Sequence, residues 1–348
     1  MNIKNKLRVL VVDDAAFMRK AIRGILELDP EIEVVGEAVN GLEALEKIRV
    51  LKPDVITLDI DMPVMDGLST IRHIMIESPL PIVALSSLIS DGAATFEALR
   101  LGVVDFIPKP SGAVSNDIDT IKQLIIDRIK VAQAVNLENL RRVRLDDKWG
   151  ASKRIETLYD YQPLEYIIAI GTNLAGPNTV IRLVSKLLPT LPAAVVVSQE
   201  ISPKIIDAFV SKFNEHVPWR MKVAQDGMPV EQGVCYLGSN KNAVSMEGDF
   251  RGEPSLKVAG KTEAPLNHLF SSVAEIFHQN SIGVLLNGTG RDGAEGFASI
   301  NKEYGTTIAQ TTECCLYPNL IQNAIEAGVV DLKLDENQLA DGIASIVL

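Results

Sequence analysis

Residues 8–14 read RVLVVDD, four apolar residues between an arginine and two aspartates. Such a short apolar run is typical of a strand buried on both faces of a parallel sheet, and the aspartates stand at its carboxyl end. Four further apolar runs follow, separated by stretches with helical periodicity. The expected strands are 8–14, 33–38, 54–60, 81–87 and 104–110. This alternation indicates βαβ units and a parallel sheet with helices on both faces.

The alternation starts again near residue 165. The expected strands of the second series are 165–171, 193–199, 233–239, 281–288 and 306–310, with a hairpin-like insertion at 242–260. Between the two series, residues 116–145 carry the pattern of one long amphipathic helix, whereas 146–163 lose the apolar pattern. We therefore predict an α/β protein with two doubly wound parallel-sheet domains, at 1–125 and 164–348, joined by a helical or irregular linker at 126–163.

The composition narrows the class of protein. The chain has 348 residues. An ordinary domain has about 150 residues, so the length indicates two domains. Its hydrophobic and charged fractions of 47% and 23% are ordinary for globular proteins, and its net charge of −11 argues against nucleic acid as a partner. Three cysteines give neither a disulfide framework nor a pair of CxxC motifs. No apolar run reaches the roughly 18 residues of a membrane span, so we expect a cytoplasmic protein without membrane insertion.

Polar side chains stand at the carboxyl ends of four strands of the first series. Asp13 and Asp14 end the first strand, Asp59 the third, Ser86 the fourth and Lys109 the fifth. Because ligands of open parallel sheets bind at this edge, we expect these side chains to converge. Three close carboxylates repel one another unless a hard cation such as Mg²⁺ neutralises them. The pattern therefore predicts a magnesium site.

The same set suits phosphoryl transfer to a carboxylate. A metal ion and a lysine offset the charge on the phosphoryl oxygens while the carboxylate attacks phosphorus. Asp59 lies between the expected metal side and the Ser86 and Lys109 side, so it is the candidate nucleophile. Capping of a helix explains any single aspartate at a strand end, but it does not explain three aspartates, a serine and a lysine that all stand at carboxyl ends of strands.

The first domain resembles the response-regulator receiver family, in the segments VLVVDDAAFMR, DVITLDIDMPVMDG, ALSS and DFIPKP. The resemblance implies a flavodoxin-like fold and phosphorylation by a histidine kinase. By this resemblance, Asp59 is the phosphoacceptor, and Asp13, Asp14 and Asp59 bind Mg²⁺ together with the backbone after Asp59. The resemblance also implies that Ser86 supplies the switch hydroxyl, that Lys109 binds the phosphate and that Phe106 is the switch aromatic.

In the second domain, three loops should meet at one end of the sheet. They are GTNLAGP (171–177), SQEISP (198–203) and NGTGRDGAEG (287–296). The glycines of the third loop indicate a close approach of the backbone to a neighbour. Phosphate binding is a common use of such a loop, but the acid Asp292 within it argues against a phosphate there.

The second domain resembles the catalytic domain of the chemotaxis protein-glutamate methylesterase family, the CheB type. The matching segments are AIG (169–171), PAAVVV (192–197), GTGRDGAEG (288–296) and IAQ (308–310). The order of receiver, linker and catalytic domain also matches. The resemblance implies hydrolysis of glutamyl methyl esters and deamidation of glutamines on chemoreceptors by a Ser–His–Asp triad, which the receiver shields until it is phosphorylated.

Carried over residue by residue, the triad is incomplete. The nucleophile position of the GASTGG turn holds Asn173, and the histidine position of the VVQHM segment holds Glu200, so that only the aspartate is retained, as Asp292. A carboxamide does not accept an acyl group near neutral pH, and loss of the nucleophile removes most of a triad's rate. Thr172 and Ser198 are adjacent, but neighbouring side chains point elsewhere.

A replacement base is also missing from the three loops. His216, His268 and His278 are expected in helical or loop segments away from them, and His73 belongs to the first domain. Glu200 and Asp292 offer a carboxylate pair, which does acid–base chemistry if one pKa is raised.

Three hypotheses follow. In the first, the protein is a phosphorylation-controlled pseudoenzyme that binds a methyl-accepting chemoreceptor or another chemotaxis protein. In the second, it is an active methylesterase or deamidase with a substitute catalytic constellation. In the third, the receiver is a phosphate sink that the second domain merely stabilises.

Overall fold

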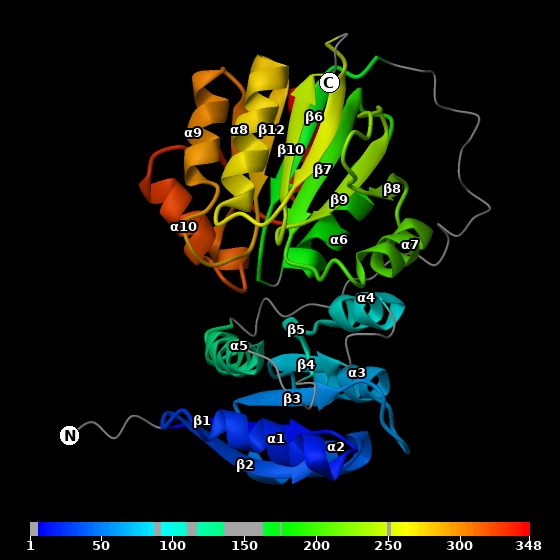
Figure 1. Ribbon diagram of the computed structural model, residues 1–348, viewed down its shortest axis with the longest axis vertical. Coiled ribbons are helices and arrows are strands. Elements are labelled where there is room, and N and C mark those ends of the chain that lie inside the picture. Colours follow the sequence, from blue (N-terminus) through cyan, green and yellow to red (C-terminus); the bar gives the residue numbers. More distant parts are fainter. Residues whose placement is uncertain (1–5, 87–91, 110–116, 136–162, 175, 249–251) are drawn as a thin grey trace. The chain divides into compact units, whose positions relative to one another are not determined.

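The computed structural model describes residues 6–86, 92–109, 117–135, 163–174, 176–248 and 252–348, except for the side chains of residues 86, 108 and 117–120. The chain divides into two compact units, Met1–Val143 and Arg144–Leu348. In each unit a parallel sheet lies between helices, as Figure 1 shows. The predicted fold class, two doubly wound α/β domains, is confirmed.

The first unit holds a five-stranded sheet in the order β2-β1-β3-β4-β5, with all pairs parallel. The strands are β1 (Leu7–Val12), β2 (Ile32–Ala38), β3 (Val55–Asp59), β4 (Ile82–Ser86) and β5 (Asp105–Pro108). The helices are α1 (Ala16–Leu26), α2 (Gly41–Leu51), α3 (Gly67–Glu77), α4 (Gly92–Leu101) and α5 (Asp117–Ala132). Buried side chains of α1 and α5 pack on one face of the sheet, and those of α2, α3 and α4 pack on the other.

Helix α5 is shorter than predicted. The amphipathic pattern indicated a helix over 116–145, but the helix ends at Ala132, and turns closed by Ala134 N–H and Val135 N–H follow it. Ile125, Ile129 and Ala132 are buried against the sheet. Most helical stability comes from such packing rather than from propensity, so the pattern alone does not sustain the helix through residues 133–135. Residues 136–145 lie outside the described part.

The second unit holds a seven-stranded parallel sheet in the order β14-β13-β12-β6-β7-β9-β8. Its strands are β6 (Tyr166–Gly171), β7 (Ala193–Gln199), β8 (Arg220–Val223), β9 (Val234–Ser239), β12 (Ser281–Leu285), β13 (Thr306–Gln310) and β14 (Leu332–Leu334). The predicted hairpin is present as β10 (Ala243–Gly248) and β11 (Pro254–Ala259), which pair antiparallel. The edge strands β8 and β14 were not predicted, because they are short and have no continuous apolar run.

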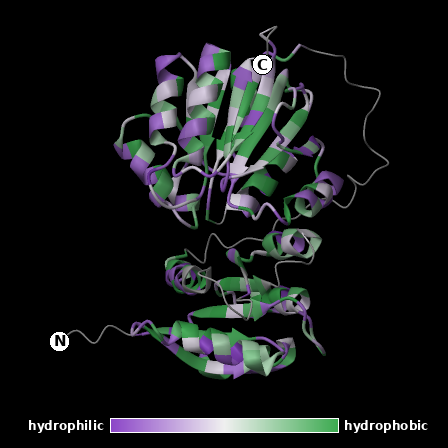
Figure 2. Ribbon diagram, viewed as in Figure 1, coloured by the Kyte–Doolittle hydropathy of each residue, from purple (hydrophilic) through white to green (hydrophobic). Residues whose placement is uncertain are grey.

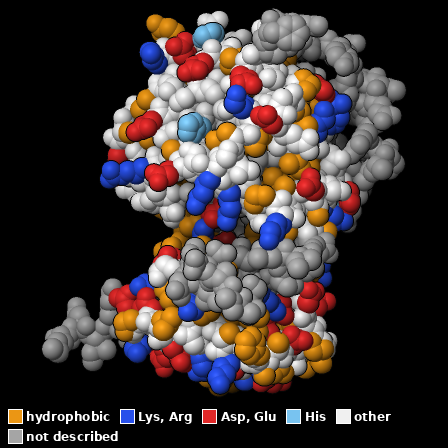
Figure 3. Space-filling model, viewed as in Figure 1, with side chains coloured by type: hydrophobic (Ala, Val, Ile, Leu, Met, Phe, Trp, Pro, Cys, Tyr) orange, Lys and Arg blue, Asp and Glu red, His pale blue; other side chains and the backbone are white. Residues whose placement is uncertain are grey.

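The helices of this unit are α6 (Gly176–Lys186), α7 (Ile206–His216), α8 (Pro265–Phe277), α9 (Ala294–Lys302), α10 (Asn319–Glu326) and α11 (Leu339–Val347), with short 3₁₀ helices at His278–Asn280 and Thr312–Cys314. Figure 2 shows hydrophobic strands between helices of mixed hydropathy. On the visible face of each unit, acidic and basic side chains are interspersed (Figure 3). Among the described residues, no helix has the length and apolar character to cross a membrane.

Packing below the end of β6 fixes the turn that follows it. Gly171 closes the strand, and a Cβ at this position would lie 2.7 Å from the ring of Phe270. Phe270 of α8 is fully buried and packs against Phe297 of α9, with ring centroids 4.9 Å apart. The glycine therefore lets the ring of Phe270 pack directly against the end of β6.

Candidate functional site

Acidic side chains converge at the carboxyl edge of the first sheet, as predicted. Asp13 and Asp14 follow β1, and Asp59 ends the neighbouring strand β3. One carboxylate oxygen from each of the three lies within 4.8 Å of the others. Asp13 and Asp59 are buried, whereas Asp14 is exposed.

Lys109, directly after β5, contacts two of these carboxylates. Its Nζ lies 2.8 Å from Asp13 Oδ2 and 2.7 Å from Asp59 Oδ2. Burial raises the pKa of Asp59, the ammonium of Lys109 opposes that rise and the charge of Asp13 adds to it. Burial disfavours the Lys109 ammonium, but its contacts with Asp13 and Asp59 outweigh this and raise the lysine pKa. The Lys109 ammonium thus offsets only part of the negative charge of the three carboxylates.

The donor set fits a hard divalent cation. Mg²⁺ prefers oxygen ligands and is commonly held by one or two carboxylates together with water and phosphate oxygens. Asp13, Asp14 and Asp59 supply such oxygens within one small volume. When bound there, Mg²⁺ offsets the charge on the oxygens of a phosphoryl group and thereby assists its transfer.

The remaining predicted receiver residues are placed less completely. Ser86 ends β4, but its side chain lies outside the described part. Phe106 in β5 is half-buried against the core on the α2, α3 and α4 face. Their switch roles stay predictions.

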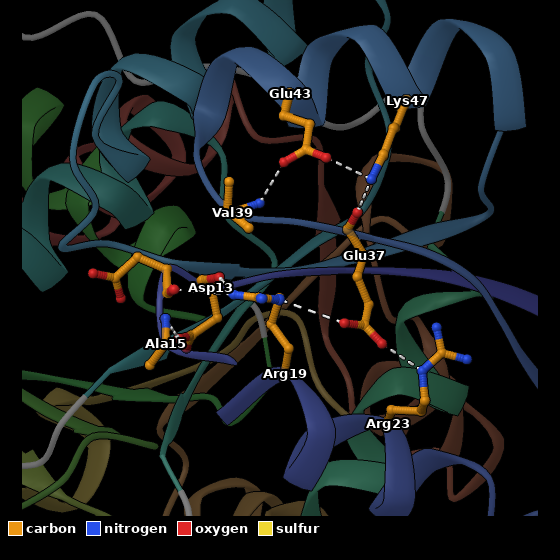
Figure 4. Close-up of polar contacts among 9 residues, drawn as sticks. Asp13, Ala15, Arg19, Arg23, Glu37, Val39, Glu43 and Lys47 are labelled. Atoms are coloured by element: carbon orange, nitrogen blue, oxygen red, sulfur yellow. Dashed lines mark hydrogen bonds and ion pairs between the residues drawn. The ribbon is translucent and has the colours of Figure 1, made fainter. Parts of the chain in front are cut away.

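Arg19 of α1 contacts the backbone of the acidic edge, and the sequence did not predict this contact. Its Nη1 donates to the backbone carbonyls of Asp13 and Asp14, at 2.9 and 3.0 Å. Its Nε lies 3.4 Å from Glu37 Oε2, and Glu37 in turn accepts from Arg23 Nε at 2.5 Å (Figure 4). Lys47 Nζ donates to the carbonyl of Glu37 and lies 2.6 Å from Glu43 Oε1. The network fixes the backbone that carries the acidic pair.

In the second unit, the three predicted loops leave adjacent strands at the same level. Gly171 at the end of β6 is in register with Leu285 of β12 on one side and with Ser198 of β7 on the other. The expectation that these loops meet at one end of the sheet is therefore confirmed.

Asn173, at the crown of the first loop, bridges to the third loop. Its Oδ1 accepts from Leu174 N–H at 2.6 Å and from Thr289 N–H at 2.8 Å. Its Nδ2 donates to the Thr289 carbonyl at 2.8 Å. The carboxamide therefore pairs with both backbone groups of Thr289, as a second strand would.

The neighbouring hydroxyls do not replace a nucleophile at this turn. Thr172 is fully buried and its hydroxyl donates to the carbonyl of Asn287 at 2.6 Å. Ser198 is also fully buried, and its hydroxyl has no hydrogen-bond partner among the described residues. Neither oxygen is exposed to a substrate in solution.

Asp292 caps a helix. Its carboxylate accepts from the N–H groups of Leu266 and Asn267 in the first turn of α8, at 2.8 and 2.9 Å. Asn267 Oδ1 accepts from Gly293 N–H and Gly296 N–H at the start of α9, at 2.8 and 3.0 Å. The two side chains thus form a reciprocal cap, each satisfying the open end of the other's helix.

Burial raises the pKa of the Asp292 carboxyl, and the three N–H groups of Leu266, Asn267 and Gly293 oppose that rise. The exposed His268 follows Asn267 in α8, and because the N–H of Asn267 donates to Asp292, this part of α8 lies against the third loop. The expectation that His268 lies away from the third loop is wrong. Glu200 is half-buried directly after β7.

Comparison with known proteins covers both units. Residues 9–117 match the family described as response regulator receiver domain, and residues 168–343 match the family described as CheB methylesterase. A protein from Pyrococcus horikoshii named protein-glutamate methylesterase/protein-glutamine glutaminase is 35% identical, over 98% of this chain and 94% of its own length. A protein of the same name from Geobacillus kaustophilus is 37% identical, over 98% and 99%. The solved CheB methylesterase catalytic domain of Thermotoga maritima aligns at 24% identity and a TM-score of 0.49, over 52% of this chain and 98% of that one.

Proposed function

Because the chain belongs to the CheB methylesterase family, with a receiver domain ahead of the methylesterase domain, we propose that it is a phosphorylation-controlled response regulator of chemotaxis whose second domain binds a partner without hydrolysing it. The input would be phosphorylation of Asp59. The output would be a change in binding to a methyl-accepting chemoreceptor or another chemotaxis protein.

The receiver edge supports the input. An Asp59 oxygen attacks the phosphorus of a kinase phosphohistidine, a P–O bond forms, the P–N bond breaks and the imidazole leaves. Lys109 lies 2.7 Å from the attacking carboxylate and supplies positive charge for the phosphoryl oxygens. Asp13 and Asp14 would hold the Mg²⁺ ion beside it.

One observation carries the proposed loss of hydrolysis: the Asn173 carboxamide occupies the strand-to-helix turn and is bound to Leu174 and Thr289. An amide nitrogen is a poor nucleophile, and this one already donates to a carbonyl. Asp292, which would orient a histidine in an intact triad, accepts hydrogen bonds from the first turn of α8 instead.

Release of methanol from methylated receptor tests this proposal. The purified protein, phosphorylated with acetyl phosphate and Mg²⁺, should release methanol at the rate of a no-protein control. The Asp59→Asn variant serves as the unphosphorylated control. Release that is faster with the wild-type protein would mean that a substitute catalytic constellation exists.

A second candidate function is hydrolysis of glutamyl methyl esters or glutamine amides. The names of the relatives favour it, and so does the place of His268 in α8, directly after Asn267, whose N–H donates to Asp292. His268→Gln separates the two candidates, because it would abolish any methanol release that depends on this histidine. Receptor binding, measured by pull-down, should be unaffected.

A further inference from the structure

We propose that the N–H groups of Leu174 and Thr289 form a complete oxyanion hole, which the carboxamide oxygen of Asn173 fills from within the chain. This inference deepens the proposed function and rests on it, since it states which part of a hydrolytic site persists. The ligand class of the hole is an acyl or carboxylate oxygen.

The first observation is the convergence of two donors on one atom. Leu174 N–H comes from the residue after the turn's crown, and Thr289 N–H comes from a loop 116 residues away. They reach the same oxygen, Asn173 Oδ1, at 2.6 and 2.8 Å. Two backbone N–H groups of this origin, one next to the nucleophile position and one from a neighbouring loop, make the oxyanion holes of many acyl-transfer enzymes.

The orientation of the carboxamide is determined by its surroundings. Both N–H groups need an acceptor, so the oxygen must face them, while the Nδ2 atom faces the Thr289 carbonyl at 2.8 Å. Reversing the amide would place N–H against N–H and oxygen against oxygen. The occupant is therefore an oxygen held as a substrate carbonyl would be.

The second observation is that contacts other than those of the Asn173 side chain also hold the two donors. Gly288 N–H donates to the Tyr317 carbonyl, and the Gly288 carbonyl accepts from Leu320 N–H, both at 2.9 Å. A Cβ at Gly288 would lie 2.3 Å from Asn173 Oδ1, so a glycine is needed for the close approach. Leu174 is 6% exposed and so is anchored in the core. Fixed donors of this kind bind an oxyanion without reorganisation.

A direct test follows the two amide protons by NMR. In the Asn173→Ala variant, Leu174 and Thr289 lose their shared acceptor, so exchange of both amides with solvent should rise by about tenfold or more relative to wild type. Sodium formate should then shift both resonances in a saturable manner. In the wild-type protein, formate should leave them unchanged, and sodium chloride at equal ionic strength is the control for salt.

A response of both amides to formate in Asn173→Ala supports the hole. A response of only one amide, or of neither in a variant whose other resonances show a native fold, overturns it. The result does not depend on methanol release: hydrolysis by the wild-type protein would sink the proposed function but would not explain a formate site that appears only when Asn173 is removed.

A covalent probe supplies a second test. In Asn173→Ser at pH 9, an alkyl fluorophosphonate should modify Ser at position 173: Oγ attacks phosphorus, the P–O bond forms, the P–F bond breaks, fluoride leaves and hydroxide takes the proton. The phosphoryl oxygen would then accept from the two N–H groups. Mass spectrometry should find one added phosphonyl group, whereas the matched Asn173→Ala variant should stay unmodified. Equal modification of both folded variants would contradict the inference.

Discussion

The carboxyl edges of the two sheets are built on one plan, yet they satisfy their polar groups in different ways. At the first edge, Asp13 and Asp59 are buried with one lysine between them, and a third carboxylate lies within 4.8 Å. The site therefore needs charge from outside the chain. At the second edge, the oxygen of Asn173 is already bound by two N–H groups of the chain. The unbalanced negative charge of the first edge favours binding of a cation and reaction with a phosphoryl group. The internal hydrogen bonds of the second edge stabilise the conformation of its loops.

Removing the phosphoacceptor should have the largest effect at the first edge. Asp59→Asn should reduce labelling by acetyl phosphate with Mg²⁺ at least about 100-fold, because the nucleophilic oxygen is replaced by a carboxamide. Intact mass spectrometry measures the added phosphoryl group. Asp54→Asn, at the opposite end of the same strand, is the matched control, and its labelling should persist. Labelling of the Asp59→Asn variant would move the phosphoacceptor elsewhere.

The Arg19 contacts predict a smaller effect at the same edge. Arg19→Ala removes the donors to the carbonyls of Asp13 and Asp14, so the concentration of Mg²⁺ that half-saturates labelling should rise several-fold. Arg19→Lys should restore part of the affinity. Arg23→Ala is the control, since Arg23 contacts Glu37 but not the two carbonyls in the described structure. If Arg19→Ala leaves the Mg²⁺ requirement unchanged, the Arg19 contacts do not contribute to Mg²⁺ binding.

At the second edge, Asp292→Ala should cost stability. The variant loses the cap of α8, for which about 1 kcal/mol is expected. For a domain of this size that corresponds to about 3 °C in the Tm of the second unit, measured by calorimetry. Asn267→Ala should have a similar effect because it removes the reciprocal cap. A stable Asp292→Ala variant would make the structural role doubtful.

The pH dependence of the first unit should show the smallest effect. The pKa of Asp59 is raised by burial, so its contribution to stability is fully present below the unfolded value of about 4 and is lost as pH rises through the folded value. In EDTA, the Tm of wild type should therefore fall more between pH 4 and pH 7 than that of Asp59→Asn. The same fall in both proteins would show that Lys109 fully compensates the buried charge.

Local signals explain where the sequence predicted the fold well. Helical periodicity was expected between the strands, and helices α2 and α3 begin directly after capping residues: Asn40 accepts from Glu43 N–H and Asp66 from Ser69 N–H. Strands β7 and β13 were also predicted at their bounds, and all of their residues except Thr306 are buried. Edge strands bury too little to leave a pattern, and β8 and β14 were missed.

The sites divide in a similar way. Convergence of Asp13, Asp59 and Lys109 follows from the topology of a parallel sheet, so the sequence predicted it. The pairing of Asn173 with Thr289 depends on the conformations of two loops that are far apart in the sequence. The pairing of Asp292 with Leu266 depends on the residue at which α8 begins. Arg19 carried no sequence signal for its role, because its partners are backbone carbonyls that every residue possesses.

The reciprocal cap between Asp292 and Asn267 bears on how activity is inferred among relatives. An aspartate that joins two helices contributes to the fold whether or not a histidine lies beside it. Its presence in a relative therefore indicates that the domain has this architecture and does not indicate that the relative is catalytically active. In this fold, the residues at positions 173 and 200 are the ones from which hydrolytic activity can be inferred.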